Sequence, residues 1–345
     1  MDSTAARDLF APLDLEQGLH LLDSLTWFPE GEEDRWPHVA DYVARNVTPS
    51  PRPDPADCRS AAERVVAAAG APAPAGELRG RWLDVPDAKA LYRIKYDLMT
   101  LLYPDDWFVF MNMGHQPAHR ARTVVDPAAP VEQMVWRYAT QLYDLVAGMV
   151  RLRAKDVLEV GCGRGGGAAF IARQHHPRTL VGLDYSSDNV AFCARVHRSA
   201  GLEFRQGDAE DLPFPDGGFD AVVNIESAHC YPHVDRFFAE ARRVLRPGGH
   251  LLFADEWWAV DKDGLLSKVA AAGLRVLDEE DITEGVIRAL EELPSYVEKL
   301  LEGLPDGAKK RAYSRFFHER VCRESAHSYL SGRFVFLRLL AVRDD

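Results

Sequence analysis

Short apolar runs alternate with amphipathic stretches through the second half of this 345-residue chain. Runs rich in valine, leucine and phenylalanine, bounded by glycine, proline or aspartate, are typical of buried parallel strands. They predict strands at 156–160, 179–184, 202–206, 219–225 and 249–255, separated by helices at 166–175, 187–200, 234–245 and 264–272. Because strands that alternate with helices are joined by right-handed crossovers, we predict an α/β fold with a parallel sheet.

The rest of the chain has mainly the helical period. We predict helices at 13–27, 39–47, 58–69, 88–102 and 131–150, a sixth strand at 275–284 and a final strand at 329–342. The stretch between the last two strands is too long for a hairpin turn, so we predict a helical cap at 285–326. The predicted divisions are a helical N-terminal lobe at 1–100, a closing segment with a lead-in helix at 101–154, and the sheet domain at 155–345.

A glycine-rich stretch, GCGRGGG, follows the first predicted strand and precedes a helix. This order forms the nucleotide-binding unit of doubly wound folds, because glycine lets a ligand approach the backbone. Gly161, Gly163 and Gly166 fit G-x-G-x-x-G, so the glycines alone leave a dinucleotide such as NAD open. Glu159 lies two residues before the first glycine, where a carboxylate could meet a cationic ligand. Asp184 ends the next strand, the place for an acid that holds ribose hydroxyls.

The sequence VLEVGCGRGGG followed by VGLDYS resembles motif I and the next acidic position of class I S-adenosylmethionine (SAM) methyltransferases. The resemblance implies a Rossmann-like, seven-stranded sheet whose last strand is antiparallel. It also implies that Asp208 meets the adenine amino group, while the backbone of Ala209 supports the ring and Tyr185 lies against it. The implied cofactor is SAM, and the implied cofactor-binding residues are Glu159, Gly161, Gly163, Asp184, Tyr185, Asp208 and Ala209.

A second polar group, ESAHCY, follows the fourth predicted strand, and LLFADEWW contains the end of the fifth. Ligands of open α/β sheets bind beyond the carboxyl ends of the strands, so His229 and Asp255 should share one crevice. Both stretches resemble those of phthiotriol and sugar O-methyltransferases, some of which use a His–Asp pair. Histidine can remove a hydroxyl proton near neutral pH, and a carboxylate can orient it. The candidate catalytic residues are His229 as base, Asp255 as its orienting residue and Glu226 as a substitute for Asp255; alternatively, His229 only caps a loop.

Composition limits the partners and the chemistry. The formal charge of −12 argues against nucleic acid or an anionic membrane as the main partner, and no apolar run is long enough to span a bilayer. Five scattered cysteines form no disulfide or zinc pattern. Cys230 and His233 lack further ligands at useful spacing, so we predict no metal site. These features and the absence of a signal-peptide pattern favour a cytoplasmic protein. The helical lobe is compatible with a homodimer.

We therefore predict a SAM-dependent methyltransferase that acts on a hydroxyl of a small apolar metabolite, such as a polyketide or a glycosylated natural product. C-methylation of an enol or enolate carbon would use the same residues and stays open. A SAM-binding cyclase or rearrangement enzyme also fits, and it would not form S-adenosylhomocysteine in step with its product. A non-catalytic SAM-binding subunit would be inactive when purified alone, and an NAD-dependent dehydrogenase would bind a nicotinamide cofactor.

Overall fold

The computed structural model describes residues 3–27, 35–47, 51–68, 88–118 and 129–345. The chain forms two compact units, one of Met1–Pro104 with Cys230–Pro232 and the other of Asp105–His229 with His233–Asp345. The larger unit contains the sheet, and the smaller one is helical. The predicted three-part division at residues 100 and 154 remains a prediction.

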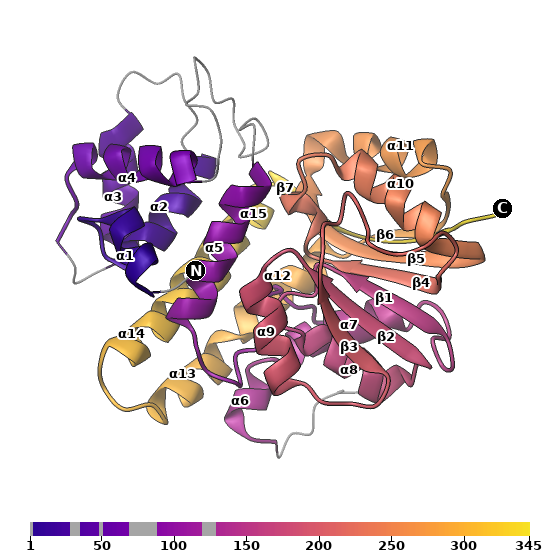
Figure 1. The fold of residues 1–345 in the computed structure, drawn as a ribbon. Coiled ribbons are helices and arrows are strands. Elements are labelled where there is room, and N and C mark those ends of the chain that lie inside the picture. The colour runs from indigo at the N-terminus through magenta and orange to yellow at the C-terminus, as the bar shows by residue number, and fades with distance from the viewer. Residues whose placement is uncertain (1–2, 28–34, 48–50, 69–87, 119–128) are drawn as a thin grey trace. The chain divides into compact units, whose positions relative to one another are not determined.

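The larger unit is built on a seven-stranded sheet with the strand order β3-β2-β1-β4-β5-β7-β6 (Figure 1). All pairs among β1 to β5 are parallel, and β7 runs antiparallel to both of its neighbours. The predicted Rossmann-like sheet with an antiparallel last strand is therefore confirmed. The strands are β1 (Asp156–Val160), β2 (Thr179–Asp184), β3 (Leu202–Gln206), β4 (Phe219–Ile225), β5 (Leu245–Trp258), β6 (Arg275–Asp281) and β7 (Phe334–Val342).

Helices cover both faces of this sheet. Figure 1 shows α10 and α11 on one face and α7, α8 and α9 on the other. Because both faces are covered, every residue of β1 and all but one residue of β4 are buried, which explains why both strands are mostly apolar. The helices are α6 (Val131–Met134), α7 (Arg137–Ala147), α8 (Gly166–His175), α9 (Ser187–Val196), α10 (Val234–Val244) and α11 (Lys262–Ala271).

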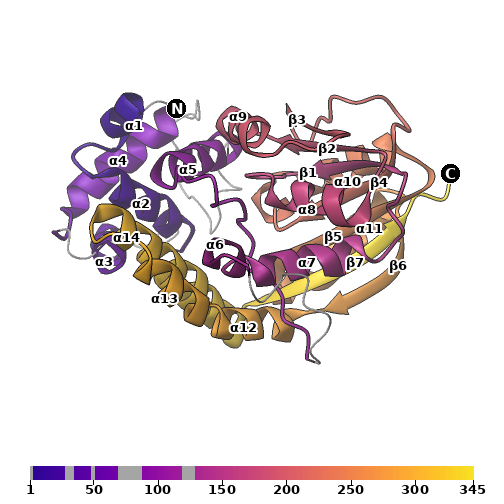
Figure 2. The ribbon, with the colours of Figure 1, turned by 90° about the horizontal axis from the view of Figure 1, so that it is seen from below.

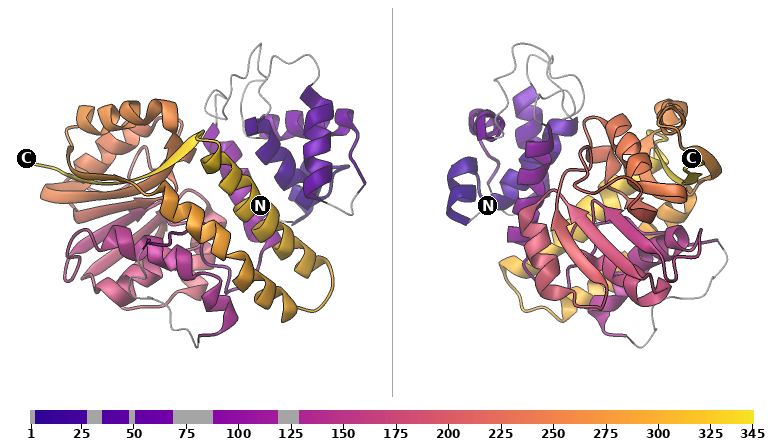
Figure 3. Two further views of the ribbon diagram at one scale, coloured as in Figure 1. Left: turned by 180° about the vertical axis from the view of Figure 1, so that it is seen from behind. Right: turned by 45° about the vertical axis from the view of Figure 1, so that its right-hand side comes forward.

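A helical insertion separates β6 from β7, as predicted. Figure 2 shows α12, α13 and α14 following one another, and Figure 3 shows β7 in yellow entering the sheet after α15. Aromatic contacts hold the insertion to the segment before α6, with ring centroids 5.0 Å apart for Phe108 and Phe316 and 4.8 Å apart for Trp107 and Tyr313. Closure over a substrate remains a prediction. The insertion comprises α12 (Thr283–Glu292), α13 (Pro294–Glu302), α14 (Ala308–Ser314), the π-helix Arg315–Ser325 and α15 (Ala326–Leu330).

Several predicted element bounds are wrong, and for three of them the structure shows the physical reason. Strand β5 is longer than 249–255 because it pairs with β7 as far as Trp258. The predicted helix 131–150 is divided at Trp136, which has φ −97° and ψ 8° and whose indole donates a hydrogen bond to the Trp107 carbonyl. The final strand starts at Phe334 rather than 329, since Gly332, with φ +69°, ends α15.

The smaller unit is a helical lobe, as predicted. Phe10 packs so closely on Gly18 that a Cβ there would lie 2.6 Å from the ring. A largely buried ion pair of 3.0 Å between Lys95 Nζ and Asp23 Oδ1 joins α5 to α2. None of the helices in the described ranges is long and apolar enough to cross a membrane. The helices of this unit are α1 (Ser3–Phe10), α2 (Leu15–Trp27), α3 (Arg35–Asn46), α4 (Pro55–Ala68) and α5 (Ala88–Leu102).

Candidate active site

The glycine-rich turn after β1 is tied to the end of β2. Gly161 and Gly163 have φ angles of +74° and +53°, in the left-handed region that favours glycine. The amides of Gly161 and Cys162 donate to the Leu183 carbonyl at 2.8 and 3.0 Å. The amide of Gly163 donates to Asp184 Oδ2 at 2.8 Å. The turn is therefore fixed at the carboxyl edge of the sheet, where α/β folds bind ligands.

Two later glycines of the turn are required for packing. A Cβ on Gly167 would lie 1.9 Å from the ring of Tyr143, and a Cβ on Gly166 would lie 2.5 Å from the carbonyl oxygen of Val109. The third glycine of the G-x-G-x-x-G match thus has a packing explanation. The match therefore gives no independent support for a dinucleotide.

Glu159 places a buried carboxyl group beside this turn. Its Oε1 accepts a hydrogen bond of 2.7 Å from the Tyr143 hydroxyl, whereas its Oε2 has no hydrogen-bond partner among the described residues. Burial raises the pKa of Glu159 to about 8. A buried carboxyl oxygen that lacks a donor fits a cationic ligand group, which would compensate the desolvation of the carboxylate. The ammonium group of SAM is a cation of this kind, so the residues present fit the cofactor.

Asp184 holds the start of the turn after β2. Its Oδ1 accepts hydrogen bonds from the amide of Ser186 at 2.9 Å and from the side-chain amide of Asn189 at 3.1 Å. The carboxylate therefore shapes both turns as well as standing where ribose is expected. The neighbouring Tyr185 is 38% exposed. The ribose and adenine contacts of these two residues remain predictions.

Asp208 and Ala209 lie in a tight turn after β3. The turn begins beside β2, because the amide of Gly207 donates to the Asp184 carbonyl at 3.0 Å. Asp208 Oδ1 accepts a hydrogen bond of 2.9 Å from the amide of Glu210 and so closes its own turn. Ala209 is buried. The adenine-binding role of this turn stays a prediction.

His229, in the loop after β4, meets Asp255, which lies within β5 before the strand ends at Trp258. Asp255 is fully buried, and its Oδ1 lies 2.7 Å from His229 Nδ1. The same carboxylate accepts hydrogen bonds from the backbone amides of Ser227 (3.1 Å), His229 (3.0 Å) and Glu256 (2.8 Å). Four donors hold the carboxylate in place. A carboxylate oxygen can only accept, so we assign the ring proton to Nδ1, which donates it to Asp255 in this hydrogen bond. Nε2 is then the nitrogen with an acceptor lone pair.

Glu226 does not hydrogen-bond the His229 ring in the contacts described and has a different partner. Its Oε2 accepts a hydrogen bond of 2.9 Å from the backbone amide of Met113. Its φ of +52° is unusual for a residue other than glycine, and such strain often accompanies functional sites. Burial, with Glu256 and Asp255 nearby, raises the pKa of Glu226 well above its ordinary value. Asp255, and not Glu226, is therefore the residue in direct contact with the histidine.

The segment before α6 links the glycine turn to Glu226, and the sequence prediction did not identify its contacts. Val109 accepts a hydrogen bond of 3.1 Å from the amide of Gly166. Met111 Sδ would lie 3.3 Å from a Cβ on Gly163. No pattern in the sequence indicates that Tyr143, from the lead-in helix, reaches Glu159.

The same segment is anchored to α12 by a buried histidine. His115 is 8% exposed, and a Cβ on Gly285 would lie 2.1 Å from its Nε2. Burial, together with the charge of Arg288, lowers the pKa of His115 from 6.5 to about 4. The ring is therefore neutral at pH 7 and acts in packing.

His115 should make the stability of the protein depend on acidity. Because its folded-state pKa lies below its ordinary value, the unfolded chain takes up a proton first, and stability falls as pH drops from 6.5 toward 4. The expected slope is about 1.4 kcal/mol per pH unit in that window. Urea unfolding of the wild type and of His115→Gln at pH 7, 5.5 and 4.5 should show the two free energies of unfolding converging in acid. Parallel curves would mean that His115 is not the titrating group.

Among the described residues, no group of three or more histidine, cysteine, aspartate or glutamate side chains is arranged to hold a metal ion. The pair of Cys230 and His233 therefore gains no further ligand from that part of the chain. The predicted lack of a metal site remains a prediction for the whole protein.

Known proteins resemble both the sequence and this geometry. A methyltransferase domain family matches residues 158–253. The fatty-acid O-methyltransferase of Mycolicibacterium smegmatis is 39% identical over 262 residues, which cover 73% of this chain and 92% of that protein. Phthiotriol/phenolphthiotriol dimycocerosates methyltransferase 1 of Mycobacterium ulcerans is 36% identical over 282 residues, which cover 79% of this chain and 97% of that protein.

Two solved structures share the fold. The [4+2]-cyclase SpnF has a TM-score of 0.53 and 24% identity, and the match covers 74% of this chain and 95% of that one. A putative sarcosine dimethylglycine methyltransferase from Galdieria sulphuraria has a TM-score of 0.55 and 15% identity, and the match covers 72% of this chain and 98% of that one. SAM is the cofactor, as predicted. Because relatives of this identity extend along most of the sequence, the chain belongs to the class I SAM-dependent methyltransferases.

Proposed function

We propose that this enzyme methylates the oxygen of a hydroxyl group on a small apolar metabolite and that His229 is the general base. The observation that carries the proposal is the 2.7 Å contact between His229 Nδ1 and the buried Asp255 Oδ1. A hydroxyl oxygen becomes a good nucleophile only as its proton leaves, and an oriented histidine is suited to take that proton.

The residues around the glycine turn are proposed to hold the cofactor. Glu159 would receive the ammonium group of the methionine portion, Gly161 and Gly163 would let it approach the backbone, and Asp184 would accept from ribose hydroxyls. Asp208, Ala209 and Tyr185 would surround the adenine. Bound SAM supplies an electrophilic methyl group on its sulfonium. The support for this arrangement is the Glu159 oxygen that lacks a donor among the described residues and the tight ties of the turn to β2.

In the proposed proton transfer, the protein contributes the side chains of His229 and Asp255. Nδ1 of His229 keeps its proton in the contact with Asp255, so Nε2 takes the proton of the acceptor hydroxyl. The ring then carries a positive charge, which the adjacent carboxylate of Asp255 stabilises. Asp255 stays in place because three backbone amides also donate to it.

The acidic surroundings of His229 favour a neutral acceptor over a carboxylic acid. Burial, and after it the charges of Glu256 and Asp255, raises the pKa of Glu226, so the surroundings disfavour a further negative charge. A carboxylate acceptor would be repelled there. It also needs no base, because it is ionised at neutral pH. The relative from Mycolicibacterium smegmatis is named a fatty-acid O-methyltransferase. The proposed acceptor group, a neutral hydroxyl, therefore differs from the carboxyl group that this name indicates.

A matched pair of acceptors tests the proposal. The purified enzyme with SAM should convert a para-alkylphenol to its methyl ether and should leave the fatty acid of equal chain length largely unchanged. Mass spectrometry identifies the product, and S-adenosylhomocysteine is measured in parallel. Faster formation of the methyl ester would overturn the proposal. A product methylated on carbon would favour the C-methylation alternative, and consumption of the acceptor without S-adenosylhomocysteine would favour a rearrangement.

We also retain, as proposals from the sequence, that the protein is cytoplasmic, forms a homodimer and acts in natural-product biosynthesis.

A further inference from the structure

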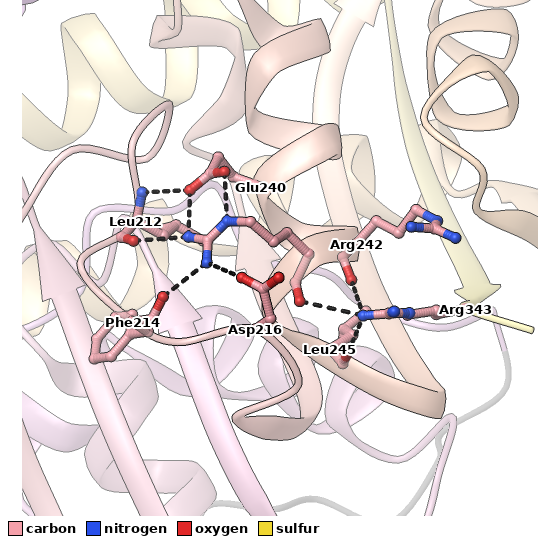
Figure 4. A network of polar contacts seen from close by, with 8 residues as sticks. Leu212, Phe214, Asp216, Glu240, Arg242, Leu245 and Arg343 are labelled. Atoms are coloured by element: carbon pink, nitrogen blue, oxygen red, sulfur yellow. Dashed lines mark hydrogen bonds and ion pairs between the residues drawn. The ribbon is translucent and has the colours of Figure 1, made fainter. Parts of the chain in front are cut away.

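The loop between β3 and β4 has little regular structure, yet it carries the two residues proposed to contact adenine. Side chains of α10 hold this loop at its far end. Glu240 Oε2 accepts a hydrogen bond of 2.8 Å from the amide of Leu212. Arg243 donates to the carbonyl oxygens of Leu212 at 2.9 Å and Phe214 at 2.8 Å, and to Asp216 Oδ1 at 2.8 Å. Figure 4 shows Leu212, Phe214, Asp216 and Glu240 converging on one guanidinium group.

Arg243 and Glu240, both on α10, also bind each other. Arg243 Nε and Nη2 each lie 2.7 Å from one oxygen of Glu240, which is the bidentate geometry of strong arginine–carboxylate pairs. This pairing raises the pKa of Arg243 and lowers the pKa of Glu240. The helix beneath them is firmly seated, since Phe237 and Phe238 are fully buried. The loop is therefore fixed to a rigid support.

A few hydrogen bonds connect α10 to the turn of Asp208 and Ala209, which is proposed to bind adenine. Asp208 Oδ1 accepts from the Glu210 amide, and the Asp211 amide donates to the Asp208 carbonyl at 3.2 Å. Glu210 Oε1 in turn accepts a hydrogen bond of 2.9 Å from the amide of His233, at the start of α10. The turn from Asp208 to Leu212 is thus held by β2 at one end and by α10 at the other.

We propose that Arg243 and Glu240 are positioning residues that set the affinity for the adenine portion of the cofactor. They touch neither the cofactor nor the reacting atoms in this scheme. They keep the turn of Asp208 and Ala209 in its binding shape, so that binding does not have to order it. The inference rests on the proposed adenine role of that turn.

The test compares two arginines at the same end of α10. Arg343 Nη1 donates to the carbonyls of Arg242, Arg243 and Leu245 at 3.1, 3.2 and 2.6 Å, and so caps α10 (Figure 4). In these three contacts it binds no carbonyl of the loop between β3 and β4. Arg243→Met should weaken binding of both S-adenosylhomocysteine and adenosine by roughly tenfold, equivalent to about 1.4 kcal/mol. Arg343→Met should lower the melting temperature but leave both affinities within about twofold. Calorimetric titration well below both melting temperatures measures this.

Two results would overturn the inference. One is a folded Arg243→Met protein with unchanged affinity for both ligands. The other is an equal loss in Arg343→Met, because the effect would then be a general weakening of α10. If Arg243→Met does not fold, Glu240→Gln and Arg243→Lys provide milder versions of the same comparison. Asp208→Ala separates this inference from its premise: if that variant keeps full affinity too, the adenine role itself fails, whereas loss in Asp208→Ala alone rejects only the positioning role.

Discussion

Replacing His229 by alanine should reduce the methylation rate at saturating SAM by ~10²–10⁴-fold, the usual contribution of a general base. SAM affinity should change little, because the proposed cofactor-binding residues belong to β1 and its glycine turn, to the end of β2 with the next residue, and to the turn after β3, and none of them belongs to the His229 loop. Initial rates of S-adenosylhomocysteine formation measure the first effect, and calorimetric titration measures the second. The para-alkylphenol described above serves as the acceptor.

Two neighbouring carboxyl groups offer matched comparisons. Asp255→Asn should cause a similarly large loss, because an amide at this position no longer fixes the proton on Nδ1 of the histidine. Glu226→Gln should retain most of the activity, since the amide oxygen of glutamine can still accept the hydrogen bond from Met113. Turnover that survives in His229→Ala would reduce the histidine to a capping residue. Equal losses in Glu226→Gln and Asp255→Asn would show that the His229–Asp255 contact has no special role.

Binding of SAM near pH 7 should release about one proton from Glu159. In the unliganded protein the pKa of this buried carboxyl is raised from 4.5 to about 8, so it is largely protonated at pH 7. A bound ammonium group favours the carboxylate and expels the proton. Calorimetric titrations in buffers of different ionisation enthalpy give the number of protons released. Glu159→Gln should abolish the release and weaken SAM binding by roughly 30-fold or more, as expected for the loss of a buried charge pair.

The same group should affect the stability of the unliganded protein. Because the folded-state pKa is raised, the protonated Glu159 contributes fully to the free energy of unfolding below pH 4.5. This contribution is lost as pH rises toward 8. The slope is about 1.4 kcal/mol per pH unit, and it should be absent in Glu159→Gln. Tyr143→Phe is the matched control: the hydroxyl donor lowers the pKa of Glu159, so its removal should raise that pKa further. Proton release that is unaffected by either substitution would assign it to another residue.

Local patterns predicted the central sheet well. Strands β1 to β4 begin and end at the predicted residues. In β1, β2 and β4 the apolar runs reflect burial on both faces of the sheet, whereas β3 is an edge strand whose residues are only partly buried or exposed. Strand β5 was predicted too short because its final residues are stabilised by the antiparallel partner β7, which lies far away in the sequence. The division of the helix at Trp136 likewise depends on a distant backbone carbonyl, that of Trp107.

The sequence by itself determined the fold class, the family and the residue types at the carboxyl ends of the strands. It did so because glycine turns, terminal acids and the His229 motif are local features with fixed places along an alternating fold. Only the tertiary structure decided between Asp255 and Glu226 as the partner of His229, since both carboxyl groups lie within reach in a linear reading. It also brought Tyr143 to Glu159 and Arg243 to the loop after β3. Those contacts arise from how helices pack on the sheet, which depends on side chains that are far apart in the chain and is therefore not encoded in any short pattern.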